Sequence, residues 1–136
     1  MKLTIPQGDA GPRFQLWEYR VSHRQLLIRC PKLSDSSQNV DVKFYDVEYV
    51  DLPSIFDDVE IVEPDQDDIT FATNRVGKPV ERDRVFVVKS GDNRHVVIAG
   101  AVVDSKSSRG LFESPFTLPP IERTEERSGR ITSTED

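Results

Sequence analysis

Hydrophobic and polar positions alternate with a period of two along much of the chain. The alternation is clearest in FQLWEYRV at residues 14–21, in RQLLIRC at residues 24–30 and in VDVKF at residues 40–44. Successive side chains of an extended chain point to opposite faces, so this period predicts strands with one buried face each. The short Ser22-His23 link predicts a hairpin between the first two strands.

The alternation changes phase at one point in the middle of the chain. Apolar residues occupy the even positions from Val40 to Phe44 and the odd positions from Tyr45 to Tyr49. A shift of one residue turns every side chain to the opposite face, so a bulge or a turn is expected near Tyr45 and Asp46.

The longest apolar runs are RVFVVKS at residues 84–90 and RHVVIAGAVV at residues 94–103, and Gly91-Asp92-Asn93 joins them. The β-branched composition and the turn residues predict a hairpin. Because these runs barely alternate, we expect central strands that are buried on both faces. Gly100 indicates a bulge or a close approach of two backbone segments.

Weaker patterns complete the sheet prediction. VEIV at residues 59–62 is typical of a short strand, residues 105–110 of a polar loop, and residues 110–116 of a last edge strand. The chain is therefore expected to be all-β, an antiparallel barrel or sandwich of about seven short strands.

No segment shows helical periodicity over three turns. Only residues 64–83 are long enough to contain a helix, and Pro64, Gly77 and Pro79 interrupt them. We therefore predict no helix.

Chain length and composition predict a single β domain with loose ends. A chain of 136 residues is most simply one domain, which we place at residues 13–118, with flexible tails at residues 1–12 and 119–136. The single cysteine excludes an internal disulfide and favours a reducing, cytoplasmic setting. Neither a signal peptide nor an apolar window of about 20 residues is found, so we expect a soluble protein without membrane contact.

Charge is distributed unevenly along this chain. Between Phe44 and Asn74 there are ten acidic residues and neither lysine nor arginine. The block carries −10, and the remaining 18 basic and 14 acidic residues give 18 − 14 = +4. Such a block attracts a basic partner, and a pI near 5.0 argues against nucleic-acid binding.

These residues lead to our main functional hypothesis, a non-enzymatic domain that binds another protein through an acidic, aromatic-containing face. Carboxylates steer a basic partner, and aromatic side chains contribute most of the energy of an interface. The predicted partner-binding residues are Tyr45, Asp46, Glu48, Tyr49, Asp51, Phe56, Asp57, Asp58 and Glu60.

Metal and catalytic sites have less support in the sequence. The run from Glu63 to Asp68 resembles the start of a calcium loop, but the glycine and glutamate of that loop are absent, so no metal or cofactor is expected. His23, His95 and Cys30 occur in no nucleophile or zinc motif, so we expect no enzyme.

Residues 40–53, VDVKFYDVEYVDLP, resemble the strand-turn-strand core of small β-rich immunity proteins from bacterial toxin–immunity systems. In that pattern an alternating strand precedes Phe-x-x-Val and a second strand, and here Phe44 and Val47 occupy those places. The resemblance implies a non-enzymatic protein that occludes the active site or exosite of a toxin. Nuclease toxins present basic surfaces, which the acidic block would suit.

Two alternatives to an immunity-type or inhibitor-type binding protein stay open. A structural or assembly protein, such as a phage or secretion-apparatus component, would form homo-oligomers by pairing the acidic residues 44–74 with the basic stretch at residues 75–94. A small enzyme would use His23 or His95 as its catalytic histidine.

Overall fold

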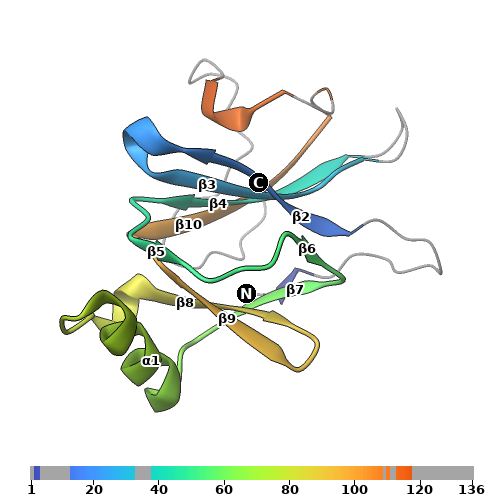
Figure 1. The fold of residues 1–136 in the computed structure, drawn as a ribbon. Helices are drawn as coiled ribbons and strands as arrows, with labels where there is room; N and C mark the ends of the chain where they lie inside the picture. Colours follow the sequence, from blue (N-terminus) through green and yellow to red (C-terminus); the bar gives the residue numbers. More distant parts are fainter. Residues whose placement is uncertain (1, 4–12, 33–37, 109, 111–112, 118–136) are drawn as a thin grey trace.

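Two five-stranded antiparallel sheets pack face to face in the computed structural model (Figure 1). The structure describes residues 2–3, 13–32, 38–108, 110 and 113–117. The first sheet has the order β1-β7-β8-β9-β5, with β1 Lys2–Leu3, β7 Val59–Val62, β8 Val85–Ser90, β9 Asn93–Ile98 and β5 Tyr49–Val50. The second has the order β10-β4-β3-β2-β6, with β10 Ala101–Ser107, β4 Asn39–Tyr45, β3 Gln25–Cys30, β2 Phe14–Arg20 and β6 Ile55–Phe56.

The predicted fold class is confirmed as an antiparallel sandwich rather than a barrel, because the two sheets stay separate. The described residues form more strands than the expected seven, because the chain also contains strands of only two residues, such as β5 and β6, which give no clear sequence signal. Lys2 and Leu3, expected in the N-terminal tail, pair instead with β7. Residues 4–12 and 119–136 of the predicted tails lie outside the described residues.

The first predicted hairpin is confirmed. β2 and β3 pair antiparallel, and the 3₁₀ turn η1 (Val21–His23) links them. The pairing register shifts between Leu16 and Glu18, so Trp17 occupies a bulge. The turn ends at Arg24, whose backbone is left-handed at φ 50°.

The chain changes sheets where the apolar pattern changes phase. β4 belongs to the second sheet and β5 to the first. Between them Asp46 has a φ of 55°, a left-handed conformation that aspartate and asparagine adopt more readily than most residues. The predicted turn near Tyr45 and Asp46 is therefore confirmed, and it is a crossing between the two sheets.

A second crossing lies beside the first. The run at residues 94–103, expected as one strand, is two strands: β9 in the first sheet and β10 in the second. Gly100 lies between them, and a Cβ atom added there would be 3.1 Å from the Cβ of Asp46. The predicted close approach at Gly100 is thus confirmed, and its neighbour is the other crossing.

One helix, α1 (Gln66–Val76), was not predicted. Its N-terminus has a capping box in which Asp65 and Asp68 each accept a hydrogen bond from the other's backbone N–H. Gly77, with φ 76°, ends it in a left-handed conformation. Pro64 and Gly77, which seemed to interrupt a helix, therefore flank it. The three-turn criterion failed because the apolar positions Ile69, Ala72 and Val76 repeat over only about two turns.

Two predictions near the C-terminus were wrong. β10 continues to Ser107, so residues 105–107 of the expected polar loop form a strand. At the expected edge strand, residues 115–117 form the 3₁₀ turn η3 (Pro115–Thr117). A third such turn, η2 (Arg82–Arg84), leads into β8.

Apolar residues are buried in two layers. The main core lies between the sheets and includes Phe44, Phe86 and Val97. A smaller core lies between α1 and the other face of the first sheet, with Ala72 against Val85, Val96 and Ile98. Residues 85–88 are all fully buried, which confirms the prediction that β8 is covered on both faces.

Replacement of Phe86 by alanine tests the inter-sheet core. The Phe86 ring is fully buried and lies 5.9 Å from the Phe44 ring in an edge-to-face contact. Because truncation leaves a cavity, Phe86→Ala should lower the free energy of unfolding in urea by about 3–5 kcal/mol. Val21→Ala, at an exposed residue, is the control. Equal losses in the two variants would contradict this packing.

Candidate functional site

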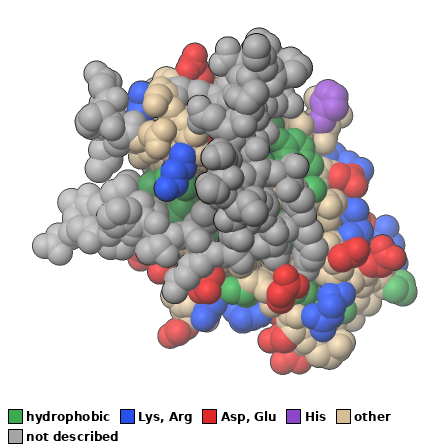
Figure 2. Space-filling view, turned by 180° about the vertical axis from the view of Figure 1, so that it is seen from behind, with side chains coloured by type: hydrophobic (Ala, Val, Ile, Leu, Met, Phe, Trp, Pro, Cys, Tyr) green, Lys and Arg blue, Asp and Glu red, His purple; other side chains and the backbone are tan. Residues whose placement is uncertain are grey.

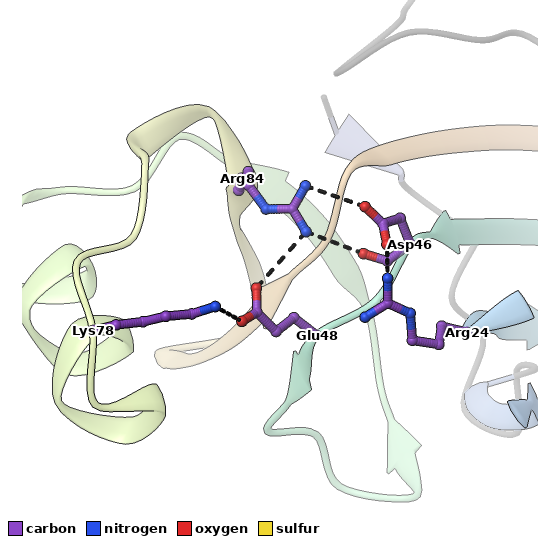
Figure 3. Close-up of polar contacts among 5 residues, drawn as sticks. All are labelled: Arg24, Asp46, Glu48, Lys78 and Arg84. Atoms are coloured by element: carbon purple, nitrogen blue, oxygen red, sulfur yellow. Dashed lines mark hydrogen bonds and ion pairs between the residues drawn. The ribbon is translucent and has the colours of Figure 1, made fainter.

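The first acidic residue of the block, Asp46, forms ion pairs with other residues of the same chain (Figure 3). Its carboxylate accepts hydrogen bonds from the guanidinium groups of Arg24 and Arg84, the latter at 3.3 Å. Arg84 also donates to the backbone carbonyl of Asp46 at 3.3 Å. Arg24 comes from the turn before β3 and Arg84 from the residue before β8, so the pairs join the two sheets at their crossing.

Glu48 extends the same network. Lys78 lies 2.8 Å from its carboxylate and Arg84 lies 3.8 Å away (Figure 3). The hydrogen bond from Lys78, with the positive charges of Lys78, Arg84 and Arg24, holds the pKa of Glu48 below its ordinary value. Two carboxylates thus face three cations, and this corner carries no excess of negative charge.

A second paired group lies at the start of α1. Arg94 of β9 donates to the Asp68 carboxylate at 2.6 Å and lies 3.7 Å from Asp65. Burial acts to raise the pKa of Asp68, but hydrogen bonds from Arg94 and from the Asp65 backbone outweigh burial and lower that pKa. These two carboxylates therefore hold the helix to the first sheet.

The β6–β7 turn carries the most exposed acids of the predicted set. Asp57, whose side chain is 77% exposed, lies 3.1 Å from Arg13. Asp58 accepts hydrogen bonds from the Gly91 backbone at 3.1 Å and from the Ser90 hydroxyl at 3.3 Å. The turn is thereby tied to the β8–β9 hairpin.

The predicted acidic residues do not converge on one face. Asp46 and Glu48 lie at the β4–β5 corner, whereas Asp57 and Asp58 lie at the β6–β7 turn, toward the other end of the sandwich (Figure 1). Glu60 lies on β7 opposite Lys89 and Lys2 of neighbouring strands. On the face seen in Figure 2, acidic and basic side chains of the described residues are interspersed.

The aromatic residues expected as anchors are used inside the fold. Phe56 is only 2% exposed and belongs to the inter-sheet core, so its prediction as a surface anchor was wrong. Half-buried Tyr49 packs edge-on against Phe71 of α1. Tyr45 packs in the same way against Phe116, while Asp51 donates its backbone N–H to Val96 at the edge of the first sheet.

A cleft opens between the sheets at the β6–β7 end. Its volume is about 560 Å³, and its lining comes from the second-sheet side (Arg13, Pro53, Ile55, Phe56, Asp57) and from the β8–β9 hairpin (Ser90, Asn93, His95). Ile55, one of the lining residues, is a large aliphatic side chain that is 49% exposed. The cleft therefore combines an apolar wall with charged and hydrogen-bonding groups.

The histidines and the cysteine do not form a catalytic pair. The His95 ring contacts the Phe56 ring edge-on, at 6.2 Å between centroids, and has no hydrogen bond within the described residues. Exposed His23 shares a 3.0 Å hydrogen bond with Ser22. Burial, and then the nearby charge of Asp41, raise the pKa of the Cys30 thiol to about 11, so it is not a nucleophile at neutral pH.

Searches for metal sites and membrane spans find none in the described part of the chain. No group of three or more histidine, cysteine, aspartate or glutamate side chains there could hold a metal ion. No helix among those residues is long and apolar enough to cross a membrane.

Sequence reasoning missed the cleft residues Arg13, Pro53, Ser90 and Asn93, and it considered His95 only as a catalytic histidine. They come from three separate segments, and only the pairing of β2 with β6 and of β8 with β9 brings them to one end. Ile55 carried a local signal, because it alternates with Phe56 on the edge strand β6, and the burial of Phe56 turns Ile55 outward.

A comparison of the chain with protein-family models, curated proteins and solved structures finds no match. The fold and the site therefore define a structural class, a small antiparallel β-sandwich with a helix on one sheet and an open cleft at one end.

The pairing of Arg94 with Asp68 predicts a specific pH dependence. The folded-state pKa of Asp68 lies below its ordinary 3.8, so the pair stabilises the fold above about pH 4 and loses this effect as the pH falls further. Arg94→Gln should lower the free energy of unfolding by about 1 kcal/mol near pH 7, since Arg94 is partly exposed. The difference from wild type should shrink below pH 4.

Urea unfolding at several pH values between 7 and 3 measures this difference. Lys106→Gln, at an exposed lysine of β10 that has no ion pair within the described residues, is the matched control, and it should change the free energy of unfolding by less than about 0.5 kcal/mol at every pH. A gap between wild type and Arg94→Gln that stays constant or widens toward pH 3 would contradict the assignment.

Proposed function

We propose that this chain is a non-enzymatic protein-binding domain that contacts its partner at the cleft end of the sandwich. The observation that carries the proposal is the open cleft of about 560 Å³ with half-exposed Ile55 in its lining. Apolar side chains exposed next to a concave polar surface are typical of interaction sites. Asp57 and Asp58, from the predicted interface, lie on the same turn.

Charge at this end favours a basic partner. Three exposed carboxylates (Asp57, Asp58 and Asp92) and one exposed guanidinium (Arg13) lie on the two turns and the strand start that surround the cleft. The formal charge of this group is −2. The resulting field steers a basic surface toward the cleft and repels nucleic acid.

The immunity-type or inhibitor-type role is the sharpest form of this proposal. In that form the cleft end would cover a basic active site or exosite, and the mechanism would be occlusion without chemistry. Asp46 and Glu48 would not take part, because Arg24, Lys78 and Arg84 already balance their charges.

Two observations weigh against the alternatives. The acidic and basic stretches expected to join neighbouring copies meet within one chain, through Lys78 with Glu48, Arg84 with Asp46 and Arg94 with Asp68. For an enzyme, a base within hydrogen-bonding reach of a nucleophile is needed. The ring of His95, the histidine that lines the cleft, contacts Phe56 and has no hydrogen bond within the described residues.

A charge-reversal variant at the cleft tests the proposal. The wild-type protein and the double variant Ile55→Lys/Asp57→Lys would each be immobilised and exposed to a lysate of the cells that produce the protein. Mass spectrometry would compare the captured proteins. We expect a protein with a basic surface to be captured by wild type and its recovery to fall by about tenfold or more in the variant, as for loss of a central interface residue.

The matched control is Val21→Lys/Asp67→Lys, which makes the same chemical changes at an exposed apolar residue and an exposed acid away from the cleft. Circular dichroism melting curves would verify that both variants fold. Recovery of the same proteins in equal amounts by wild type and both variants would contradict the proposed contact region.

A further inference from the structure

The geometry points to the side chain that the cleft receives: we propose that it binds a guanidinium group, an arginine presented by the partner. This inference rests on the proposed function and specifies the chemistry of the same site. It is carried by three features of the cleft: an apolar wall, a carboxylate at its lining, and an internal arginine already held there.

The apolar wall suits the stem of a long side chain. Pro53 and Ile55 line the cleft and are exposed, and the buried Phe56 ring, in edge-to-face contact with His95, also belongs to the lining. The methylene groups of arginine bury along such surfaces while the charged head stays near water. A volume of about 560 Å³ is more than one side chain needs, so backbone of the partner can enter as well.

The charge at the cleft selects a cation. Asp57 is part of the lining, and Asp58 and Asp92 add negative charge on the adjoining turns. An anion would approach these carboxylates at an energetic cost, and Arg13, the arginine among the described lining residues, already lies 3.1 Å from Asp57. The half-buried imidazole ring of His95 also lines the cleft, and a guanidinium group stacks on a planar ring more readily than an ammonium group does, because it is planar and weakly hydrated.

Arg13 shows that this carboxylate accepts a guanidinium. Its Nε atom pairs with Asp57 Oδ1, and both side chains are mostly exposed, at 60% and 77%. Exposed ion pairs contribute little to stability, so a second arginine can join or replace Arg13 at small free-energy cost. A carboxylate has about four lone-pair positions, so a guanidinium can bind beside the partners that Asp57 already has.

A titration with two small probes tests this inference directly. The ¹⁵N-labelled full chain would be titrated with N-acetyl-arginine amide, which carries the guanidinium, and with N-acetyl-citrulline amide, its uncharged counterpart of nearly the same shape. We expect saturable shifts of the backbone amide signals of Ile55, Asp57 and Asn93. The arginine probe should bind about threefold more tightly than the citrulline probe, as for a partly exposed ion pair.

Two variants, each with one aspartate replaced by asparagine, make the test specific for the cleft. Asp57→Asn should abolish the preference for the arginine probe, whereas Asp67→Asn, an exposed acid on α1 outside the cleft, should retain it. Equal affinity for both probes, or a preference that persists in Asp57→Asn, would overturn the inference.

The outcomes separate this inference from the proposed function. If the cleft double variant loses its captured protein but the arginine probe shows no preference, the domain binds its partner there through another group, and the inference is wrong. If the probe binds as expected but no captured protein depends on the cleft, the guanidinium site stands and the protein-binding proposal is overturned.

Discussion

The structure depends most on the contact between the two chain crossings. At Asp46 the chain passes from β4 of the second sheet to β5 of the first, and at Gly100 it passes from β9 of the first sheet to β10 of the second. Backbone hydrogen bonds join the crossings, from Gly100 to Tyr45 at 2.8 Å and from Glu48 to Ile98 at 2.7 Å. A Cβ added at Gly100 would lie 3.1 Å from that of Asp46, so a larger residue there would require the corner to shift by a few tenths of an ångström. This contact sets how the two sheets face each other.

The crossings also decide the role of the acidic block. They place Asp46 and Glu48 beside Arg24, Arg84 and Lys78, so the start of the block serves to hold the sheets together. Further along, Asp65 and Asp68 cap α1 and bind Arg94. The acids most available for a partner are those of the β6–β7 turn. A strongly acidic stretch of sequence thus becomes a set of local pairings, with one exposed end beside the cleft.

Sequence reasoning found the strands because their signals are local. The phase change marked the crossing at Asp46, and Gly100, inside the apolar run at residues 94–103, marked the crossing beside it. Only the structure shows that these two crossings touch. The functional site was harder to predict from the sequence, because strand order determines which cation lies beside which carboxylate. Phe56 was misplaced because alternation gives two faces without saying which is buried. The sequence pattern also could not reveal that Arg29 and Asp41 form a fully buried ion pair, at 2.7 Å, that joins β3 to β4.

A double-mutant cycle on the crossings tests the account most directly. Gly100→Ala should lower the free energy of unfolding by about 1–3 kcal/mol, because the added methyl group overpacks against Asp46. Asp46→Gly removes the side-chain atoms that face Gly100, and glycine tolerates the left-handed conformation at position 46. In this background, Gly100→Ala should lower the free energy of unfolding by at least about 1 kcal/mol less than it does in the wild type. Additive effects, within about 0.5 kcal/mol, would contradict the claim that contact between the crossings organises the fold.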